Sequence, residues 1–312
     1  MPFGQVVVGP PGAGKSTYCA GLAHFFELQG RACAVVNLDP AAEKIAYETS
    51  VDIRDLVAAD GVQTELGLGP NGALLWSLEY AAENLDWFEE RLRPLLDQGR
   101  YLILDAPGQV ELHTQKGGFQ RLLAWLSQAL HVRLAVICLV DVHLCGDAGK
   151  FLAAMLFSLS VALLFELPQV NVLSKVDLLN SQGLGLALSF QSLLRADDLE
   201  GLADALGPGT SPQLRALTRD LGEVVQEFGL VRYVPLAVQD PEAMQALVWA
   251  ADRALGFVSS ASASGEEHGD NPFRAQLAAQ QQNNPARLWE SVVDKYAPQA
   301  GCDDVFDERD EL

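Results

Sequence analysis

A glycine-rich segment near the N-terminus, Gly9-Pro10-Pro11-Gly12-Ala13-Gly14-Lys15-Ser16, matches the phosphate-binding pattern G-x-x-x-x-G-K-[ST]. It follows an apolar run over residues 3–8 and precedes a segment with helical spacing over residues 16–28, the order that this motif requires. Glycines let backbone N–H groups approach an anion, and the helix N-terminus adds positive potential. We expect Lys15 to reach the β- and γ-phosphates and Ser16 to ligate Mg²⁺. The predicted phosphate-binding residues are Gly12, Ala13, Gly14, Lys15, Ser16 and Thr17.

A second candidate group follows the apolar run Tyr101-Leu102-Ile103-Leu104-Asp105. A strand that ends in aspartate is the Walker B pattern, whose carboxylate holds Mg²⁺ directly or through water. The chain continues to Gly108 and Gln109, which gives the Asp-x-x-Gly-Gln spacing of small GTPases. There the glycine N–H senses the γ-phosphate and the glutamine orients the attacking water. Glu111 fits either a water-positioning group or an exposed loop acid, and its spacing leaves both open.

A third group, Ser174-Lys175-Val176-Asp177, follows a predicted strand at the point where GTPases place [NT]-K-x-D. The aspartate of that motif accepts hydrogen bonds from the guanine N1–H and 2-amino group, a donor pair that adenine lacks. The lysine stem covers the base, and here Ser174 replaces Asn or Thr. A loop after the last predicted strand, Ala237-Val238-Gln239-Asp240, is a further base-contacting candidate. These residues predict guanine-nucleotide binding, with GTP and GDP as ligands.

Two further segments have ambiguous chemistry. Asp39 follows the predicted strand Arg31 to Asn37, and the carboxyl ends of parallel strands are where open α/β sheets bind ligands. Because Asp-Pro is also a turn signal, an N-cap or turn role for Asp39 stays open. The segment Gly67-Leu68-Gly69-Pro70-Asn71-Gly72 is predicted to be a turn-rich loop.

The elements that must position these residues alternate between apolar strands and amphipathic helices, which predicts an α/β fold. The 312 residues allow one large domain or two small ones, and 49% hydrophobic content supplies a sizeable core. The predicted strands lie near residues 3–8, 31–37, 101–105, 134–141, 169–173 and 231–236. The predicted helices lie near 16–28, 77–96, 150–165, 184–206, 212–228 and 241–257.

Composition excludes some classes of partner. The formal net charge of −20 argues against nucleic acid or an anionic membrane as the main partner, although a local basic pocket is compatible with it. Five cysteines without a C-x-x-C pair favour free thiols in a reducing compartment. The apolar stretch Phe151 to Phe165 is shorter than a membrane span and predicts a buried helix. We expect no signal peptide, and we interpret the terminal Arg309-Asp310-Glu311-Leu312 as part of an acidic tail.

Taken together, these motifs resemble the GPN-loop GTPases over roughly residues 3 to 258. Gly69-Pro70-Asn71 matches the tripeptide after which that family is named, and weaker similarity occurs at Lys295-Tyr296-Ala297-Pro298. Phe3-Gly4-Gln5, Leu173-Ser174-Lys175 and Gln239-Asp240 favour its second paralogous group, whereas Ala42-Glu43 and Asp52-Ile53-Arg54 lean toward the third. Other similar blocks are Asn37 to Ala41, Leu78 to Tyr80, Asn84 to Trp87, Pro107 to Leu112 and Leu173 to Asp177.

The resemblance implies a P-loop NTPase of the signal-recognition and MinD-like class, with a mostly parallel sheet flanked by helices. Residues 1–258 would form the GTPase domain with the GPN loop near 67–72, and residues 259–312 a linker, a short docking helix near 288–296 and an acidic tail. It also implies a dimer in which Asn71 acts on the partner's phosphate site. Asp39, Gln109 and Glu111 would position water, and Ser16, Asp105 and Asp39 would form the Mg²⁺ site.

The biological setting comes from the resemblance alone. It implies a homodimer or a heterodimer with a paralogue, RNA polymerase II subunits or chaperones as partners, and a role in polymerase assembly or nuclear import. The expected location is cytoplasmic with shuttling to the nucleus, without direct contact to nucleic acid or membrane. Two alternatives to a Mg²⁺-dependent GTPase switch stay open: an ATPase of the same dimeric class, and a non-enzymatic assembly module whose acidic tail or apolar helix at 151–165 binds clients.

Overall fold

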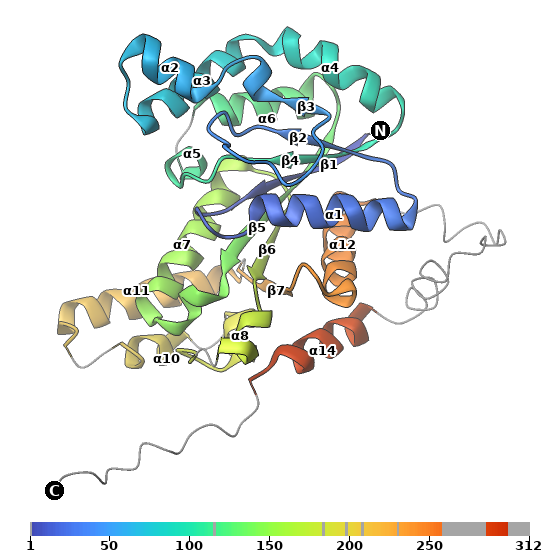
Figure 1. The fold of residues 1–312 in the computed structure, drawn as a ribbon. Helices are drawn as coiled ribbons and strands as arrows, with labels where there is room; N and C mark the ends of the chain where they lie inside the picture. The colour runs from blue at the N-terminus through green and yellow to red at the C-terminus, as the bar shows by residue number, and fades with distance from the viewer. Residues whose placement is uncertain are drawn as a thin grey trace, which may run out of the picture.

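The computed structural model describes residues 2–114, 117–182, 185–196, 199–206, 209–229, 231–257 and 285–298. These residues form a seven-stranded sheet in the order β3-β2-β4-β1-β5-β6-β7, and every pair in it is parallel (Figure 1). The α/β fold expected from the sequence is therefore confirmed. The strands are β1 (Phe3–Val8), β2 (Cys33–Asn37), β3 (Val51–Asp52), β4 (Tyr101–Asp105), β5 (Arg133–Asp141), β6 (Gln169–Ser174) and β7 (Tyr233–Leu236).

Strand β1 is central to the sheet and determines where a ligand can bind. It pairs with β4 on one side, with Val7 opposite Asp105, and with β5 on the other, with Val8 opposite Cys138. Since strands that follow β1 in the chain lie on both of its sides, the order of the sheet reverses there. Loops after neighbouring strands diverge at such a point and leave a crevice at the carboxyl edge of the sheet.

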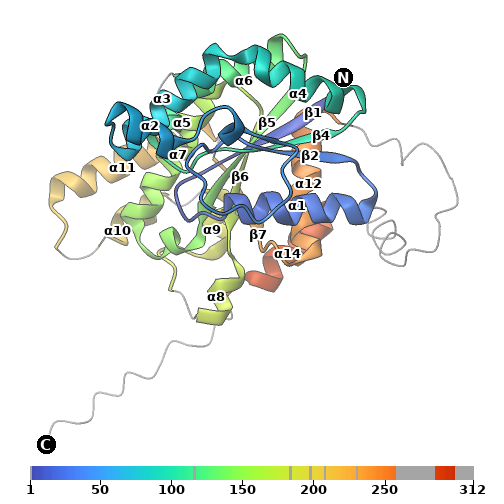
Figure 2. The same ribbon diagram turned by 45° about the horizontal axis from the view of Figure 1, so that its top comes forward.

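Helices cover both faces of the sheet (Figure 2). Val7 joins the core formed with α1, α12 and the C-terminal helix, whereas Val6 and Val8 join the core formed with α3, α4 and α6. This two-sided burial explains why the strands are continuously apolar. The longer helices are α1 (Lys15–Gln29), α2 (Ala59–Leu66), α3 (Pro70–Glu83), α4 (Leu85–Asp97), α6 (Gly118–Gln128), α7 (Ala148–Phe165), α11 (Pro212–Phe228), α12 (Pro241–Leu255) and α14 (Pro285–Tyr296). Short helices are η1 (Ile53–Asp55), α5 (Glu111–Thr114), η2 (Val142–Gly146), α8 (Asp177–Gln182), α9 (Phe190–Arg195) and α10 (Leu199–Asp204).

Three predicted elements differ in extent from the structure. The prediction of a single helix near residues 77–96 is wrong. Asn84 leaves the helical conformation (φ −116°, ψ 51°) and separates α3 from α4. The loop expected at 67–72 ends at Gly69, because Pro70 occupies the first turn of α3, where its missing N–H costs nothing. Over the described residues of 184–206 the expected single helix is instead α9 and α10, and Ala196 ends α9 in the left-handed conformation at φ 50°.

A helix, α14, covers the expected position near 288–296, and its role as a docking helix stays a prediction. The predicted linker at 259–271 and the acidic tail at 303–312, like Cys302, lie outside the described residues. Cys19, Cys33, Cys138 and Cys145 are free thiols, as expected.

Helix α7 is apolar over its whole length, and by length and composition alone it could cross a membrane. Its Phe151 and Met155 are buried in one core, and its Phe157 and Val161 in the other. The helix thus contributes to both cores. The predicted helix at 151–165 is confirmed, and one of its faces is buried. Leu163 on the opposite face is 67% exposed.

Arg31 fastens α1 to the sheet and to α12. Its guanidinium donates two 2.9 Å hydrogen bonds to the Asp252 carboxylate on α12. The same group lies 4.3–4.4 Å from the ring centroids of Phe26, Tyr101 and Phe257. Burial raises the pKa of Asp252, and the hydrogen bonds from Arg31 oppose that rise.

We predict that Arg31→Ala lowers the free energy of unfolding by about 3 kcal/mol, because the variant leaves the Asp252 carboxylate buried without a partner. Arg31→Lys is expected to lose less, since it keeps the charge but not the two-pronged geometry. Urea denaturation followed by circular dichroism measures both. Arg219→Ala, on the exposed side of α11, is the control. An Arg31→Ala midpoint equal to that of the control would contradict the prediction.

Candidate active site

The loop between β1 and α1 has a backbone that only glycine adopts readily. Gly9, Gly12 and Gly14 have φ values of 153°, 79° and 90°. A Cβ atom on Gly9 would lie 2.4 Å from the carbonyl oxygen of Leu139 on β5, so this position also requires the absence of a side chain. Gly14 is the N-cap of α1. Because it has no side chain to accept a capping hydrogen bond, the first N–H groups of the helix are open to an anion.

Lys15 is the first residue of α1, and its amine is turned back over the loop. Its Nζ donates to the carbonyl oxygens of Gly9 (3.1 Å) and Pro10 (3.2 Å). Burial lowers the pKa of Lys15, and the nearby charges of Asp105 and Asp39 oppose this shift. The loop therefore holds a buried amine whose charge interacts with two carboxylates, and the motif places a phosphate-binding lysine at this position.

Asp105 ends β4, directly beside β1. Its Oδ2 accepts a 2.6 Å hydrogen bond from the Tyr47 hydroxyl, while its buried Oδ1 has no partner of good hydrogen-bond geometry among the described residues. Burial raises the pKa of Asp105, and the hydrogen bonds from Tyr47 and Ser16 and the charge of Lys15 oppose that rise. Ser16 is exposed in the first turn of α1.

These groups fit a Mg²⁺ ion. The Asp105 Oδ1 is a buried oxygen that a cation would satisfy, and the exposed Ser16 hydroxyl would supply a second oxygen ligand. The described residues contain no cluster of three or more His, Cys, Asp or Glu suited to a metal. Mg²⁺ does not need one, since it keeps several waters and takes one or two carboxylates together with substrate phosphates.

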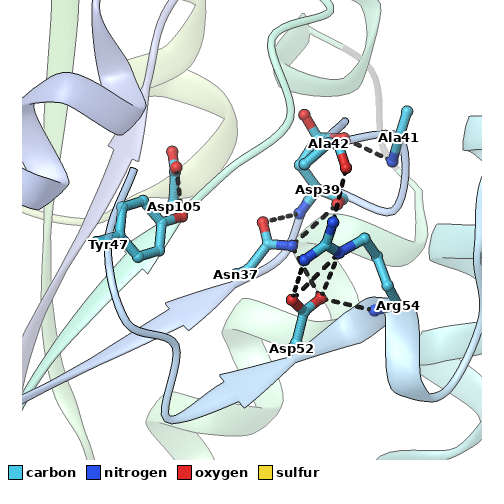
Figure 3. A network of polar contacts seen from close by, with 8 residues as sticks. All are labelled: Asn37, Asp39, Ala41, Ala42, Tyr47, Asp52, Arg54 and Asp105. Carbon is cyan, nitrogen blue, oxygen red and sulfur yellow. Dashed lines mark hydrogen bonds and ion pairs between the residues drawn. The ribbon is translucent and has the colours of Figure 1, made fainter. Parts of the chain in front are cut away.

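Asp39 lies in a network of polar side chains on the loop after β2 (Figure 3). Its Oδ1 accepts a 2.9 Å hydrogen bond from the Ala41 N–H, which is the turn-forming role that the sequence left open. Its own N–H donates to Asn37 Oδ1 at 3.0 Å. Burial raises the pKa of Asp39; the Ala41 N–H and the charge of Lys15 oppose this, and the charge of Asp105 adds to it. The turn therefore orients a carboxylate whose field reaches Lys15.

The network continues from Asn37 to the next strand. Asn37 Nδ2 donates to Asp52 Oδ1 at 2.9 Å, and Arg54 grips the same carboxylate with Nε at 3.0 Å and a terminal nitrogen at 2.6 Å (Figure 3). Arg54 also donates to the Ala42 carbonyl at 2.8 Å. Burial alone would raise the pKa of Asp52, but the hydrogen bonds from Arg54 hold it below its ordinary value. Sequence reasoning missed Tyr47, Asn37, Asp52 and Arg54 as parts of the site, because none belongs to a nucleotide-binding motif.

Gly108 lies against the phosphate-binding loop. A Cβ atom there would lie 2.9 Å from Lys15 Nζ and 3.4 Å from Pro11 Cα. Gln109 is half-buried, and Glu111 is exposed at the first residue of α5. Neither side chain forms a hydrogen bond with Lys15, Asp39 or Asp105 in the described part of the chain. The structure thus places Gly108 beside the phosphate-binding loop, with Gln109 on the adjoining loop and Glu111 at the start of α5.

The predicted base-binding residues surround a cavity of about 470 Å³ next to the phosphate-binding loop. Ser174 Oγ lies 2.9 Å from the Ala13 carbonyl oxygen and 3.1 Å from that of Val140, so this hydroxyl joins the base motif to the loop. Lys175 adopts the left-handed conformation (φ 61°), and its Nζ donates to Asp141 Oδ2 at 2.6 Å. The predicted residues that line the cavity are Ala13, Gly14, Thr17, Lys175, Asp177 and Ala237.

Asn71 lies apart from these groups. It is exposed in the first turn of α3 and does not line the base cavity.

Asp141, which anchors Lys175, is a further residue that sequence reasoning missed. Burial alone would raise the pKa of Asp141, but the hydrogen bond from Lys175 holds it below its ordinary value.

A parallel sheet with a glycine-rich anion loop after its central strand, and an aspartate on the neighbouring strand, defines the class of P-loop nucleotide-binding proteins. Residues 7–257 match a family model described as "Conserved hypothetical ATP binding protein". The chain is 44% identical over 258 residues to GPN-loop GTPase 2 of Danio rerio (82% of this chain and 81% of the relative). It is 42% identical over 259 residues to GPN-loop GTPase QQT1 of Arabidopsis thaliana (83% and 86%).

The chain therefore belongs to the GPN-loop GTPase family, and the expected resemblance is confirmed. A solved structure supports the fold: the apo GTPase PAB0955 of Pyrococcus abyssi matches with a TM-score of 0.66 and 24% identity, over 81% of this chain and 97% of that one.

We predict that Gly108→Ala folds normally but lowers nucleoside triphosphate turnover by about 10- to 100-fold, the scale of a misplaced reacting group. The added Cβ meets the flexible end of Lys15, so the amine must leave its position while the backbone is unaffected. Steady-state phosphate release and the thermal midpoint measure the two effects. Gly185→Ala, which enters open space, is the matched control. Turnover equal to that of the control would show that Gly108 does not set the position of Lys15.

Proposed function

We propose that this chain is a Mg²⁺-dependent GTPase that cleaves GTP to GDP and phosphate and works as a dimeric nucleotide switch. The observation that carries the proposal is that Lys15, Asp105 and the base cavity share one edge of the sheet. The phosphate-binding loop and the base motif are joined there by the contact between Ser174 and Ala13. One nucleotide can therefore occupy both halves of the site.

The reaction is attack of water on the γ-phosphate. Lys15 and the N–H groups of the loop would stabilise the charge that develops on the phosphate oxygens. Ser16 and Asp105, with Asp39 nearby, would hold Mg²⁺, which supplies charge neutralisation between the β- and γ-phosphates when it is bound. We assign the orientation of the water to Gln109, Asp39 and Glu111, and sensing of the γ-phosphate to the Gly108 N–H.

Base selection separates this proposal from the alternative, an ATPase of the same dimeric class. The description of the family model, which names ATP, favours that alternative. Asp177 begins α8 at the rim of the base cavity. A carboxylate there accepts the paired donors of guanine, whereas adenine leaves it without partners. We therefore assign Asp177 to guanine recognition and the Lys175 stem to cover the base.

We predict that Asp177→Asn lowers the preference for GTP over ATP by about 10- to 100-fold, the scale of hydrogen bonds to a charged group. The amide has one acceptor oxygen and presents an N–H₂ group to a second donor. Titration calorimetry with GTP, GDP and ATP in the presence of Mg²⁺ measures the ratio. Asp220→Asn, an exposed acid on α11, is the control. An unchanged ratio in folded Asp177→Asn protein would remove this residue from base recognition, and equal wild-type affinities would favour the ATPase.

Dimer formation is supported by the surface around the GPN tripeptide. Asn71 is exposed there, and the rings of Trp76 and Tyr80 stack at 5.2 Å with an interplanar angle of 10°. Clustered exposed apolar side chains of this kind mark interaction surfaces. The large exposed apolar residues of α2, α3 and the loop between them are Leu66, Leu68, Leu75, Trp76 and Tyr80. We propose that a second GPN-loop subunit covers this surface and receives Asn71 at its phosphate site.

We predict that Asn71→Ala lowers GTP turnover by about 100-fold, the effect of removing one donor to a developing negative charge. Lys15→Ala abolishes turnover in its own subunit. An equimolar mixture of the two variants should recover about one quarter of wild-type activity, since half of the dimers are mixed and each carries one complete site. Native mass spectrometry verifies the mixed dimer. Mixed dimers with no recovered activity would contradict action in trans.

The wider role stays a prediction. A function in RNA polymerase II assembly or nuclear import, polymerase subunits or chaperones as partners, and a cytoplasmic location with shuttling to the nucleus are implied by the family resemblance. The alternative of a non-enzymatic assembly module has support in the exposed Leu163 on α7. Absence of GTP turnover at high protein concentration would favour that alternative.

A further inference from the structure

The C-terminal helix α14 is separated from the GTPase fold in sequence but packs against it beside the base cavity. It contacts α12 and α8 (Figures 1 and 2). Val292, Val293 and Tyr296 are buried in the same core as α1 and β5. The last two residues of the helix, Lys295 and Tyr296, also line the base cavity together with Lys175 and Asp177. α14 thus forms part of the wall of the nucleotide site.

Two polar side chains of α14 converge on one carboxylate. Tyr296 Oη donates to Asp240 Oδ2 at 2.7 Å, and Lys295 Nζ donates to the same oxygen at 2.7 Å. The side chain of Asp240 is only 6% exposed. Burial alone would raise the pKa of Asp240, but the hydrogen bonds from Lys295 and Tyr296 hold it below its ordinary value. The α14 contacts therefore stabilise the charge of the buried Asp240 carboxylate.

Asp240 shapes the loop that contacts the base. Its N–H donates to the Ala237 carbonyl at 3.0 Å, which closes the turn over residues 237–240. Its Oδ1 accepts from the Glu242 N–H at 3.1 Å and so caps α12. Residues 236–241 all line the cavity. A shift of Asp240 caused by α14 would therefore also move the backbone of the 237–240 loop, which lines the cavity.

We propose that α14 is the outer wall of the guanine site: Lys295 and Tyr296 hold the 237–240 loop through Asp240, so that α14 docking and nucleotide binding strengthen each other. This inference rests on the proposed base site. Tyr296 and Lys295 are positioning residues, since they act on the base through the loop. Two equilibria that share one contact must favour each other by the same factor, so nucleotide is expected to hold α14 in place.

The first test separates positioning from packing. Tyr296→Phe keeps the buried ring and removes only the hydroxyl that Asp240 accepts from. We expect its Kd for GDP to rise about 5-fold, below the full effect of a hydrogen bond to a charged acceptor because Lys295 remains. Glu290→Gln, at an exposed position on the same helix and outside the cavity, should leave the Kd unchanged. Calorimetry gives the affinities, and thermal midpoints show that both variants are folded.

The second test measures the reciprocal effect on the full chain. Hydrogen exchange of the amides over residues 287–297 should slow when GDP is added to the wild-type protein, and less so in Tyr296→Phe. Protection of the phosphate-binding loop, residues 12–17, reports GDP binding in the same sample. A Tyr296→Phe affinity equal to that of Glu290→Gln would overturn the inference. So would unchanged exchange in α14 while the loop becomes protected.

Failure of the underlying base site would give a different pattern. Equal wild-type affinities for GDP and ADP, with Asp177→Asn binding both normally, would remove the guanine site and the α14 inference with it. Selective GDP binding that depends on Asp177 but not on Tyr296 would overturn the α14 inference alone.

Discussion

The site depends above all on the close packing of the loop after β1 against the strands on either side. Gly9 lies so near the Leu139 carbonyl of β5 that no side chain fits between them, and Asp105 ends the strand on the other side. Because all strands are parallel, every loop that carries a functional group leaves the sheet at the same edge. Lys15, Asp105 and Ser174 are brought together by this arrangement although they are distant in sequence.

The phosphate site needs local positive potential, whereas the molecule as a whole carries a negative net charge. The chain has a net charge of −20, yet its ligand is proposed to be a polyanion. Local groups resolve the conflict: a buried amine, the uncapped N-terminus of α1, and an aspartate oxygen that only a donor or a cation would satisfy. Burial raises the pKa of both Asp39 and Asp105 and lowers that of Lys15, so each charged form is held against a desolvation cost. Nucleotide and Mg²⁺ would relieve these costs together.

The periphery of the site is built from ion pairs that position loops. Arg54 and Asp52 support the turn that carries Asp39, Asp141 holds Lys175, and α14 holds Asp240. Asp141 and Asp240 accept hydrogen bonds from side chains of other segments, and Asp52 accepts them from Arg54 two residues away and from Asn37 on β2. Such paired groups fix a geometry more than they add net stability, because desolvation offsets much of their attraction. The loops that contact phosphate and base are thereby ordered from outside the motifs themselves.

The sequence by itself determined the elements whose signals are local. Strand 101–105, the phosphate-binding loop and the position of Lys15 follow from apolar periodicity and from a glycine spacing that few other structures require. Only the tertiary structure decided which distant side chains meet. Tyr47 reaches Asp105, Asp52 on β3 holds Asn37, which accepts from the Asp39 N–H, and Tyr296 completes the base cavity. The break between α3 and α4 at Asn84 also escaped local reasoning, because residues on both sides keep helical periodicity. Periodicity records which face of a segment is buried; the partner across that face depends on how the sheet brings separate segments together.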